Sequence, residues 1–242
     1  MNKVDFKKVY KDLYLPKNEP SIITVPAMTF IMVDGKGNPN EPNGEYKQAV
    51  ELLYALSYTI KMSKMGGFTP EGYYDYVVPP LEGLWWLSDS SSRNFYANKE
   101  EYHWTSMIRQ PEFVTQEVFS WAQAAVIDKR KKEAFSSISK VKHISDTDIN
   151  KKTNIDITKV RLETFAEGLC VQMMHFGPYD TEPESINRID AYIHDNNLMN
   201  DIGNPTSDEI VRRHHEIYLN DPRKVKPESL KTILRHPVRK MN

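Results

Sequence analysis

Apolar and polar residues alternate in a short segment near the end of the chain, at residues 213–222. In an extended strand successive side chains point to opposite faces, so Ile217 and Leu219 share one face. Glu216 and Tyr218 share the other. We expect the apolar pair to face a core. Glu216 and Tyr218 then either meet water, as in an ordinary half-exposed strand, or line a cavity.

The same pattern predicts three strands and one helix in the first half of the chain. A strand-like run at residues 21–33 ends in a turn rich in Gly and Pro. A helix is expected from residue 45 to about 64, because apolar residues recur there at a spacing of three and four. Two further strands are expected at 73–87 and 102–109, and the intervening loop at 88–98 is rich in Ser and Asp.

A similar set of elements is expected in the second half. Residues 160–176 read as a strand, and the following helix is expected to begin at Thr181, with Glu184 completing a capping box. Glu184 therefore receives a structural role. After the strand at Glu216, residues 231–238 are expected to close the set as an edge strand, because a proline within them cannot donate to a ladder.

A helix beginning near Thr115 and a polar segment at 136–159 separate the two sets. We expect residues 1–20 to form an N-terminal extension and residues 21–240 to form one domain. Its two half-modules are expected at 21–110 and 160–240, joined by the bridging helix and its polar connector at 111–159.

The two sets share the order strand, helix, strand, strand, and residues 85–89 parallel residues 217–221. This duplication predicts an α+β fold of two strand-helix-strand-strand modules related by a pseudo-twofold, with antiparallel sheets and a ligand cleft between them. In this register Trp86 projects as Tyr218 does, so both halves supply aromatic walls. Glu216 then lies at or near the floor of the cleft.

Composition excludes several kinds of partner. The chain has 242 residues, of which 39% are hydrophobic and 27% charged, and its formal net charge is -1. A balanced charge gives no field that attracts nucleic acid or an anionic membrane, so neither is expected as a partner. The N-terminus lacks a signal-peptide pattern and no apolar run is long enough to span a bilayer, which predicts a cytoplasmic protein.

Metal and cofactor chemistry finds no support in the sequence. Cys170 is the single cysteine, which excludes an internal disulfide and a multi-cysteine metal site. His214 and His215 could be taken for metal ligands, but adjacent residues on a strand face opposite ways and no third ligand is in sight. We therefore expect no metal and no cofactor.

Four segments in a fixed order carry a resemblance to a known family, at residues 30–37, 80–86, 176–179 and 215–222. By these segments the chain resembles the GyrI-like small-molecule-binding family, which is also seen as effector domains of bacterial multidrug-responsive regulators. The resemblance implies a cavity between two strand-helix-strand-strand modules, with an acidic residue of the last-but-one strand inside it. Glu216 occupies that place.

Stand-alone members with Leu-Glu-Gly-Leu-Trp-Trp and His-Glu-Ile-Tyr-Leu, here at 81–86 and 215–219, are similar to proteins that hydrolyse the strained cyclopropane of alkylating toxins. This resemblance implies detoxification, with Glu216 as the base that activates water and Tyr218 as the donor to the ring-opened product. Glu82 is a second candidate acid. It can equally be a strand-end carboxylate in solvent.

The competing class is a binding module without catalysis, in which Glu216 neutralises a cationic, lipophilic ligand. Aromatic and Met side chains would contact the ligand, and the candidates are Trp85, Trp86, Trp104, Met107, Met173, Tyr179 and Tyr218. Trp104, Met107 and Met173 are also explained as simple core residues.

Two further classes would need features that the sequence does not display. A transcription regulator needs a DNA-binding module, but the roughly twenty residues before the first strand show no helix-turn-helix pattern. A protein-binding inhibitor, such as one acting on a gyrase, needs an exposed complementary patch. The expected partner is therefore a small lipophilic or cationic aromatic molecule.

Overall fold

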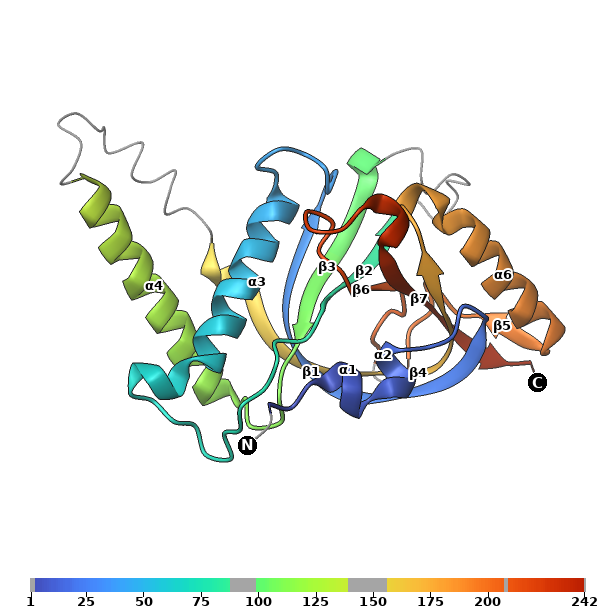
Figure 1. Cartoon of the computed structure of the whole chain (residues 1–242). Coiled ribbons are helices and arrows are strands. Elements are labelled where there is room, and N and C mark those ends of the chain that lie inside the picture. Colours follow the sequence, from blue (N-terminus) through green and yellow to red (C-terminus); the bar gives the residue numbers. More distant parts are fainter. Residues whose placement is uncertain (1–2, 88–98, 139–155, 207–208, 242) are drawn as a thin grey trace.

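Figure 1 shows a computed structural model of the chain, which describes residues 3–87, 99–138, 156–206 and 209–241. In these ranges seven strands form one antiparallel sheet. The strands are β1 (Ser21–Lys36), β2 (Leu81–Leu87), β3 (Tyr102–Arg109), β4 (Val160–Phe176), β5 (Leu198–Asn200), β6 (His214–Tyr218) and β7 (Lys231–Lys240). The α-helices are α1 (Phe6–Val9), α2 (Lys11–Tyr14), α3 (Glu45–Lys61), α4 (Gln116–Ile138) and α6 (Glu182–Asp195).

The sheet closes on itself. Its order is β4-β1-β3-β2-β6-β7-β5, and an additional pairing of β4 with β7 joins the two ends of the run from β4 to β7. Each strand of this ring therefore has an inner and an outer face. The α+β class is confirmed. The two halves share one sheet, however, because β1 pairs with β4 and β2 pairs with β6.

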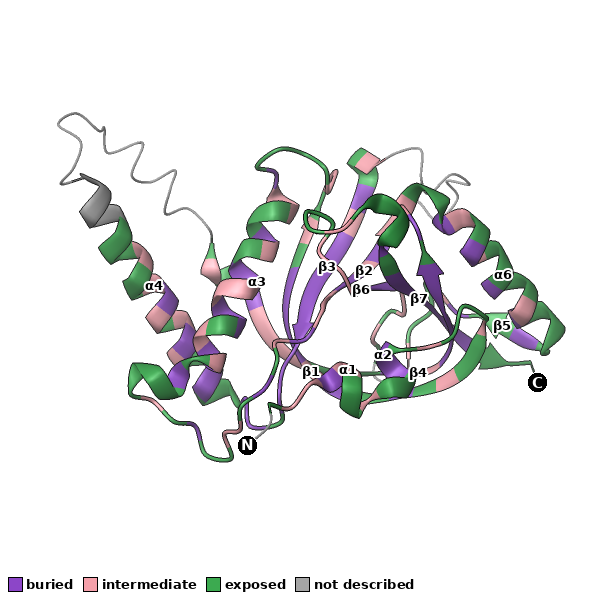
Figure 2. Ribbon diagram, in the orientation of Figure 1, coloured by how far each residue is buried: buried purple, intermediate pink, exposed green. Residues whose placement is uncertain are grey.

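Apolar side chains pack on both faces of the ring, and Figure 2 shows strand β3 almost entirely buried. The inner core includes Phe30, Met32, Met107, Ile217 and Ile233. On the outer face, α3 and α4 pack with β1 and β3, and α6 packs with β4 and β7. The outer sides of the helices are exposed (Figure 2).

The N-terminal helices α1 and α2 also supply the inner core. Phe6, Leu13 and Tyr14 are at most 6% exposed and pack with the inner strand residues. The carbonyl of Leu13 accepts a hydrogen bond from Arg235 Nη2 on β7, at 3.0 Å. This segment, predicted only as an extension, thus fills the inner face together with the strands.

The predicted strand over residues 73–78 is wrong. Tyr76 forms only an isolated bridge with Val4, and the regular strand begins at Leu81. Two prolines at 79–80 cannot donate to a ladder, and the ring of Tyr76 packs against Phe113, with centroids 5.9 Å apart. The aromatic side chains of this segment pack against neighbouring rings, and its backbone does not pair as a regular strand.

Strand β7 is not the predicted edge strand, because it pairs with β4 on one side and with β6 on the other. Pro237 lies opposite Cys170, beyond the last β6 pair at Arg235, so its missing N–H does not interrupt the β6 ladder. The start of α6 also differs from the prediction. Thr181 makes no capping bond, and its hydroxyl donates to the carbonyl of Pro178.

Other boundaries follow the prediction within a few residues. Strand β4 has the predicted bounds, β1 continues to Lys36, and α3 ends at Lys61 before a short 3-10 turn at Ser63–Gly66. The predicted loop at 88–98 lies outside the described residues, as does the part of the predicted connector at 139–155.

Candidate functional site

The alternation along β6 places Glu216 and Tyr218 on the outer face of the ring, while Ile217 belongs to the inner core. Glu216 lies opposite Gly83 of β2. A Cβ on Gly83 would lie 2.7 Å from the indole nitrogen of Trp85 and 3.4 Å from the Tyr218 hydroxyl. The glycine therefore leaves the space in which these two side chains meet.

The Glu216 carboxylate is held by donors on its own strand. The Tyr218 hydroxyl donates to Glu216 Oε2 at 2.7 Å, and Trp85 Nε1 donates to the same hydroxyl at 2.9 Å. His214 Nε2 lies 3.0 Å from Glu216 Oε1. Glu216 is 8% exposed, so these contacts form in a poorly solvated setting. Hydrogen bonds of this kind offset the cost of burying a carboxyl group.

A pair of histidines leads from Glu216 toward the surface. His214 Nδ1 lies 2.9 Å from His236 Nε2, and His236 Nδ1 lies 3.7 Å from Asp190 Oδ1 on α6. Burial lowers the pKa of His236, which favours its neutral form. If His236 Nε2 donates to His214 Nδ1, the hydrogen of His214 is on Nε2 and can be donated to Glu216 Oε1.

Aromatic rings from both halves of the chain surround this carboxylate. The ring of Tyr46 on α3 lies 5.4 Å from that of Trp85, and Tyr179, in a 3-10 turn before α6, lies 5.8 Å from Tyr218. Burial and the charge of Glu216 raise the pKa of Tyr218 well above its usual value. Burial likewise raises the pKa of Tyr179 to about 12. These phenols therefore stay protonated and can donate hydrogen bonds.

A second acid, Glu182, is buried near the same place. It is the first residue of α6, is 2% exposed, and its Oε1 has no hydrogen-bond partner among the described residues. Burial, followed by the negative charge of Glu216, raises its pKa well above the ordinary value. Glu182 is thus set to carry a proton near the Glu216 carboxyl group.

Two comparisons identify the family. Residues 132–239 match the family model of the GyrI-like small molecule binding domain. The structure is similar to a hydrolase from Listeria innocua, with 44% identity, 98% of this chain and 100% of that chain covered, and a TM-score of 0.76. The chain belongs to the GyrI-like family. An uncharacterized conserved protein from Listeria innocua is 45% identical over 98% of this chain and 100% of its own, with a TM-score of 0.80. No curated protein matches.

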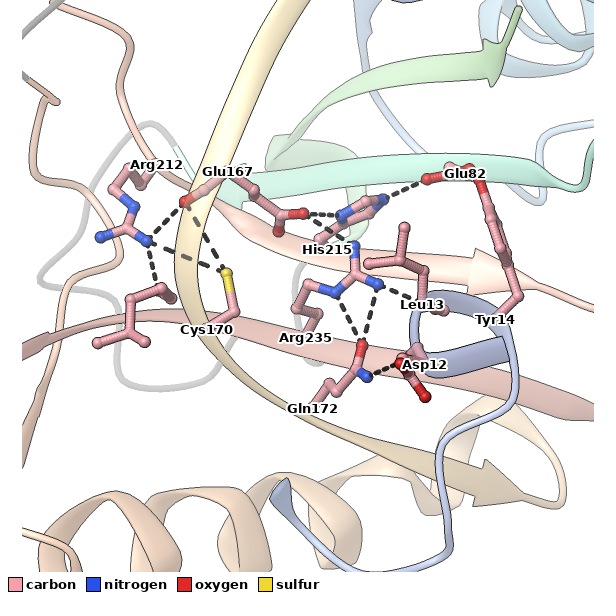
Figure 3. Close-up of polar contacts among 11 residues, drawn as sticks. Asp12, Leu13, Tyr14, Glu82, Glu167, Cys170, Gln172, Arg212, His215 and Arg235 are labelled. Carbon is pink, nitrogen blue, oxygen red and sulfur yellow. Dashed lines mark hydrogen bonds and ion pairs between the residues drawn. The ribbon is translucent and has the colours of Figure 1, made fainter. Parts of the chain in front are cut away.

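In this GyrI-like protein the inner face holds a separate polar network, which contains Glu82 (Figure 3). Glu82 is fully buried, with Oε1 accepting from Tyr14 at 3.1 Å and Oε2 lying 3.0 Å from His215 Nε2. Glu82 therefore neither meets solvent nor joins Glu216, because the two side chains point to opposite faces of neighbouring strands. The alternative expectation, that Glu82 is a strand-end carboxylate in solvent, is wrong.

The predicted register of Trp86 is also wrong. Trp86 lines a cavity on the inner face, where the Arg213 guanidinium lies 4.5 Å from its ring centroid. Trp85 takes the expected place beside Tyr218, because β2 and β6 pair antiparallel with Trp85 opposite His214. The prediction aligned residues 85–89 with residues 217–221 by sequence, and this alignment is offset by one residue from the observed faces. An offset of one residue moves a side chain to the other face of a strand.

The remaining predicted contacts divide between core and site. Met107 lies in the inner core, Met173 packs beneath α6, and Trp104 is fully buried with its ring 5.1 Å from that of Tyr46. Tyr179 alone of this group touches Tyr218. The GyrI-like cleft between the two modules stays a prediction.

Sequence reasoning missed four residues of this GyrI-like site, namely Tyr46, Glu182, Asp190 and His236. Each comes from an element whose position depends on the closed sheet and its helices, so no local spacing could have found them.

In the described ranges, no helix has the length and apolar composition needed to cross a bilayer. Within the same ranges, no three His, Cys, Asp or Glu side chains gather as metal ligands.

Proposed function

We propose that this GyrI-like protein hydrolyses the strained cyclopropane ring of lipophilic alkylating toxins and so detoxifies them. The observation that carries the proposal is the buried Glu216 carboxylate, with Tyr218 and His214 at its two oxygens. The rings of Trp85 and Tyr179, which both contact Tyr218, suit a flat lipophilic substrate. The similarity to a protein named as a hydrolase adds support.

The reaction is an addition of water to a cyclopropane conjugated with a carbonyl group. The water oxygen bonds to a ring carbon, the strained C–C bond breaks, and its electron pair moves into the conjugated carbonyl. Glu216 accepts a proton from the water, and the new enolate or phenolate oxygen takes a proton from an acid. No oxidant or reductant is needed.

Three side chains have complementary roles in this scheme. Glu216 is the base. Once it is protonated, the Tyr218 hydroxyl is free to rotate its hydrogen toward the product oxygen while Trp85 still donates to it. Glu182, kept protonated by burial and by the charge of Glu216, supplies the proton.

A second candidate is a multidrug-binding module, favoured by the same carboxylate among aromatic rings. There Glu216 would neutralise a cationic lipophilic ligand and Trp85, Tyr179 and Tyr218 would contact its rings. This function requires no activated water. The two candidates therefore differ in turnover and not in affinity.

The test measures turnover of a cyclopropane-bearing alkylating toxin in water enriched in oxygen-18, with the enzyme well below the toxin concentration. We expect a ring-opened product with one labelled oxygen, many turnovers, and a loss of about 100-fold or more in Glu216→Gln. Glu184→Gln, a change at an exposed position of α6, is the matched control and keeps full activity. Saturable binding without product would reject hydrolysis of that toxin and favour the binding module.

A further inference from the structure

The inner face of the ring has a cavity that the proposed reaction does not use. Its volume is about 320 Å³, and its walls come from β1, β2, β3, β4 and the segment before β6. The apolar part of the lining includes Met32, Leu84, Trp86 and Phe165. Leu84 lies opposite His215, whose side chain points to the face away from Glu216, and Trp86 is on the same face of β2 as Leu84, so the cavity lies on the other side of the sheet from Glu216.

Glu167 lines this cavity and has one buried carboxylate oxygen without a hydrogen-bond partner among the described residues. It is 7% exposed, and its Oε2 accepts from His215 Nδ1 at 3.0 Å and from Arg235 Nη1 at 2.9 Å (Figure 3). Burial alone would raise the pKa of Glu167, but His215 and Arg235 outweigh it and hold the value at about 2. Its Oε1 has no hydrogen-bond partner within the described residues. An ionised carboxylate has no hydrogen to donate, so this oxygen requires a donor.

The acidic residues of the wall and two of its three arginines already have charged partners, and the third arginine, Arg213, lies over the Trp86 ring. Arg161 lies 2.6 Å from Asp34 and also pairs with Glu163. Arg212 lies 2.8 Å from Asp201. A ligand with a full charge would disturb these pairs and lose its own hydration, which disfavours both cations and anions.

We infer that this cavity binds a small, neutral, flat aromatic molecule that donates one N–H or O–H to Glu167 Oε1. Ligand cavities of this kind combine apolar walls with a few placed polar groups. Trp86 and Phe165 supply the aromatic walls, and the Arg213 guanidinium, 4.5 Å from the Trp86 ring, bounds the cavity beside them. The donor satisfies Glu167 Oε1, the one buried side-chain oxygen without a partner among the residues that line this cavity.

Indole and benzofuran test the inference on the unmodified chain, because they have nearly the same shape and only indole has an N–H. Each is titrated into the nitrogen-15-labelled protein, and amide shifts give the affinity and the location. We expect saturable indole binding with shifts near Leu84, Trp86 and Glu167, and binding of benzofuran at least about tenfold weaker. Equal affinities, no saturation with indole, or shifts gathered at Glu216 would each overturn the inference.

Two variants locate the site without replacing Glu167, which also bonds to His215 and Arg235. Leu84→Phe fills the cavity from β2 and is expected to reduce indole affinity at least tenfold. Glu216→Gln, on the outer face, is expected to bind indole as the unmodified protein does. Undiminished indole binding by a folded Leu84→Phe protein, or its loss in Glu216→Gln, would contradict a site on the inner face.

Discussion

Glu182 and Glu216 are two buried carboxyl groups with different surroundings. Glu216 has Tyr218 and His214 at its oxygens, whereas Glu182 Oε1 has no partner among the described residues. Burial and the Glu216 charge raise the pKa of Glu182 well above its ordinary value. Residues placed in this way can act as a base and an acid at one pH, as the proposed hydrolysis requires.

The substitution Glu182→Gln tests this assignment through stability. Folded Glu182 keeps a proton that the unfolded chain releases near its ordinary pKa of 4.5, so the folded wild type loses stability as pH rises above that value. The neutral Gln avoids this loss. We expect its free energy of unfolding, relative to wild type, to increase by up to about 1.4 kcal/mol per pH unit.

Urea unfolding between about pH 5 and 8 measures the difference. Glu184→Gln is the control, because Glu184 is exposed on the same helix and its replacement should give no such trend. A Glu182→Gln effect that stays constant over this range would show that Glu182 is ionised in the folded protein.

Single residues were predictable where local alternation decides the face. Glu216, Tyr218 and Ile217 follow the period of two in β6. Trp86 was misplaced because the two halves were aligned by sequence, whereas the face of Trp85 is fixed by pairing with β6. Glu182 could not be identified, since only the packing of α6 against the sheet buries it.

At the scale of elements, β6 contributes side chains to two polar clusters, one on each face of the sheet. His214 and Glu216 point outward, whereas His215 points inward between Glu82 and Glu167. The inner residues are almost completely buried, with His215 fully so. Burial alone would lower the pKa of His215, but the carboxylates, above all Glu167, raise it to about 9.

This raised pKa predicts a pH dependence of stability. The His215 contribution is complete below its unfolded value of 6.5 and is lost as pH rises through about 9. The wild type should lose about 3 kcal/mol of unfolding free energy over this window from this group. A His215→Gln variant should be less stable at neutral pH and should lack that part of the decline.

The His215 ring can also be followed directly by NMR, with the exposed His194 ring as an internal reference. A His215 midpoint near the ordinary 6.5 would contradict the prediction. In that case the inner carboxylates would not stabilise the protonated ring.

Elements with a clear period were predicted well, and those with a mixed composition were not. Strand β4 and helix α3 follow their apolar spacing. The segment at 73–78 has strand composition, but its rings pack on neighbouring aromatic residues. Pro237 led to the prediction of an edge strand at β7. The strand instead pairs on both sides, and its pairing with β6 ends at Arg235, before the proline.

At the scale of the whole molecule, α1 and α2 complete the inside of the ring. The carbonyls of Asp12 and Leu13 accept hydrogen bonds from Gln172 and Arg235, two buried residues on β4 and β7. Tyr14 donates to Glu82. The first residues of the chain are therefore linked to the polar network at the centre of the sheet (Figure 3).

Leu13→Ala tests how much this packing contributes. Leu13 is 6% exposed, so we expect its truncation to reduce the free energy of unfolding by about 2 to 5 kcal/mol. Leu15→Ala is the matched control, because Leu15 is 50% exposed and should change stability little. Equal effects of the two substitutions in chemical denaturation would show that α2 does not pack on the inner core in solution.

The overall arrangement was predictable only in part. The order of strands and helices gave the α+β class, but the joining of the two halves into one sheet depends on the β1–β4 and β2–β6 pairings. Long-range pairing of this kind leaves little trace in a single sequence. The same limit applies to the core contacts of the N-terminal helices, which form with strands far away in the chain.

The alternation of residues 214, 215 and 216 in β6 also bears on how such proteins can diverge. Substitution of an outer residue can change the chemistry of the outer site while the inner ion pairs stay intact. Insertion or deletion of one residue would exchange the two sets and bring both to the wrong side of the sheet. A change of length in this strand would thus disturb both faces, whereas a substitution on its outer face would disturb only one.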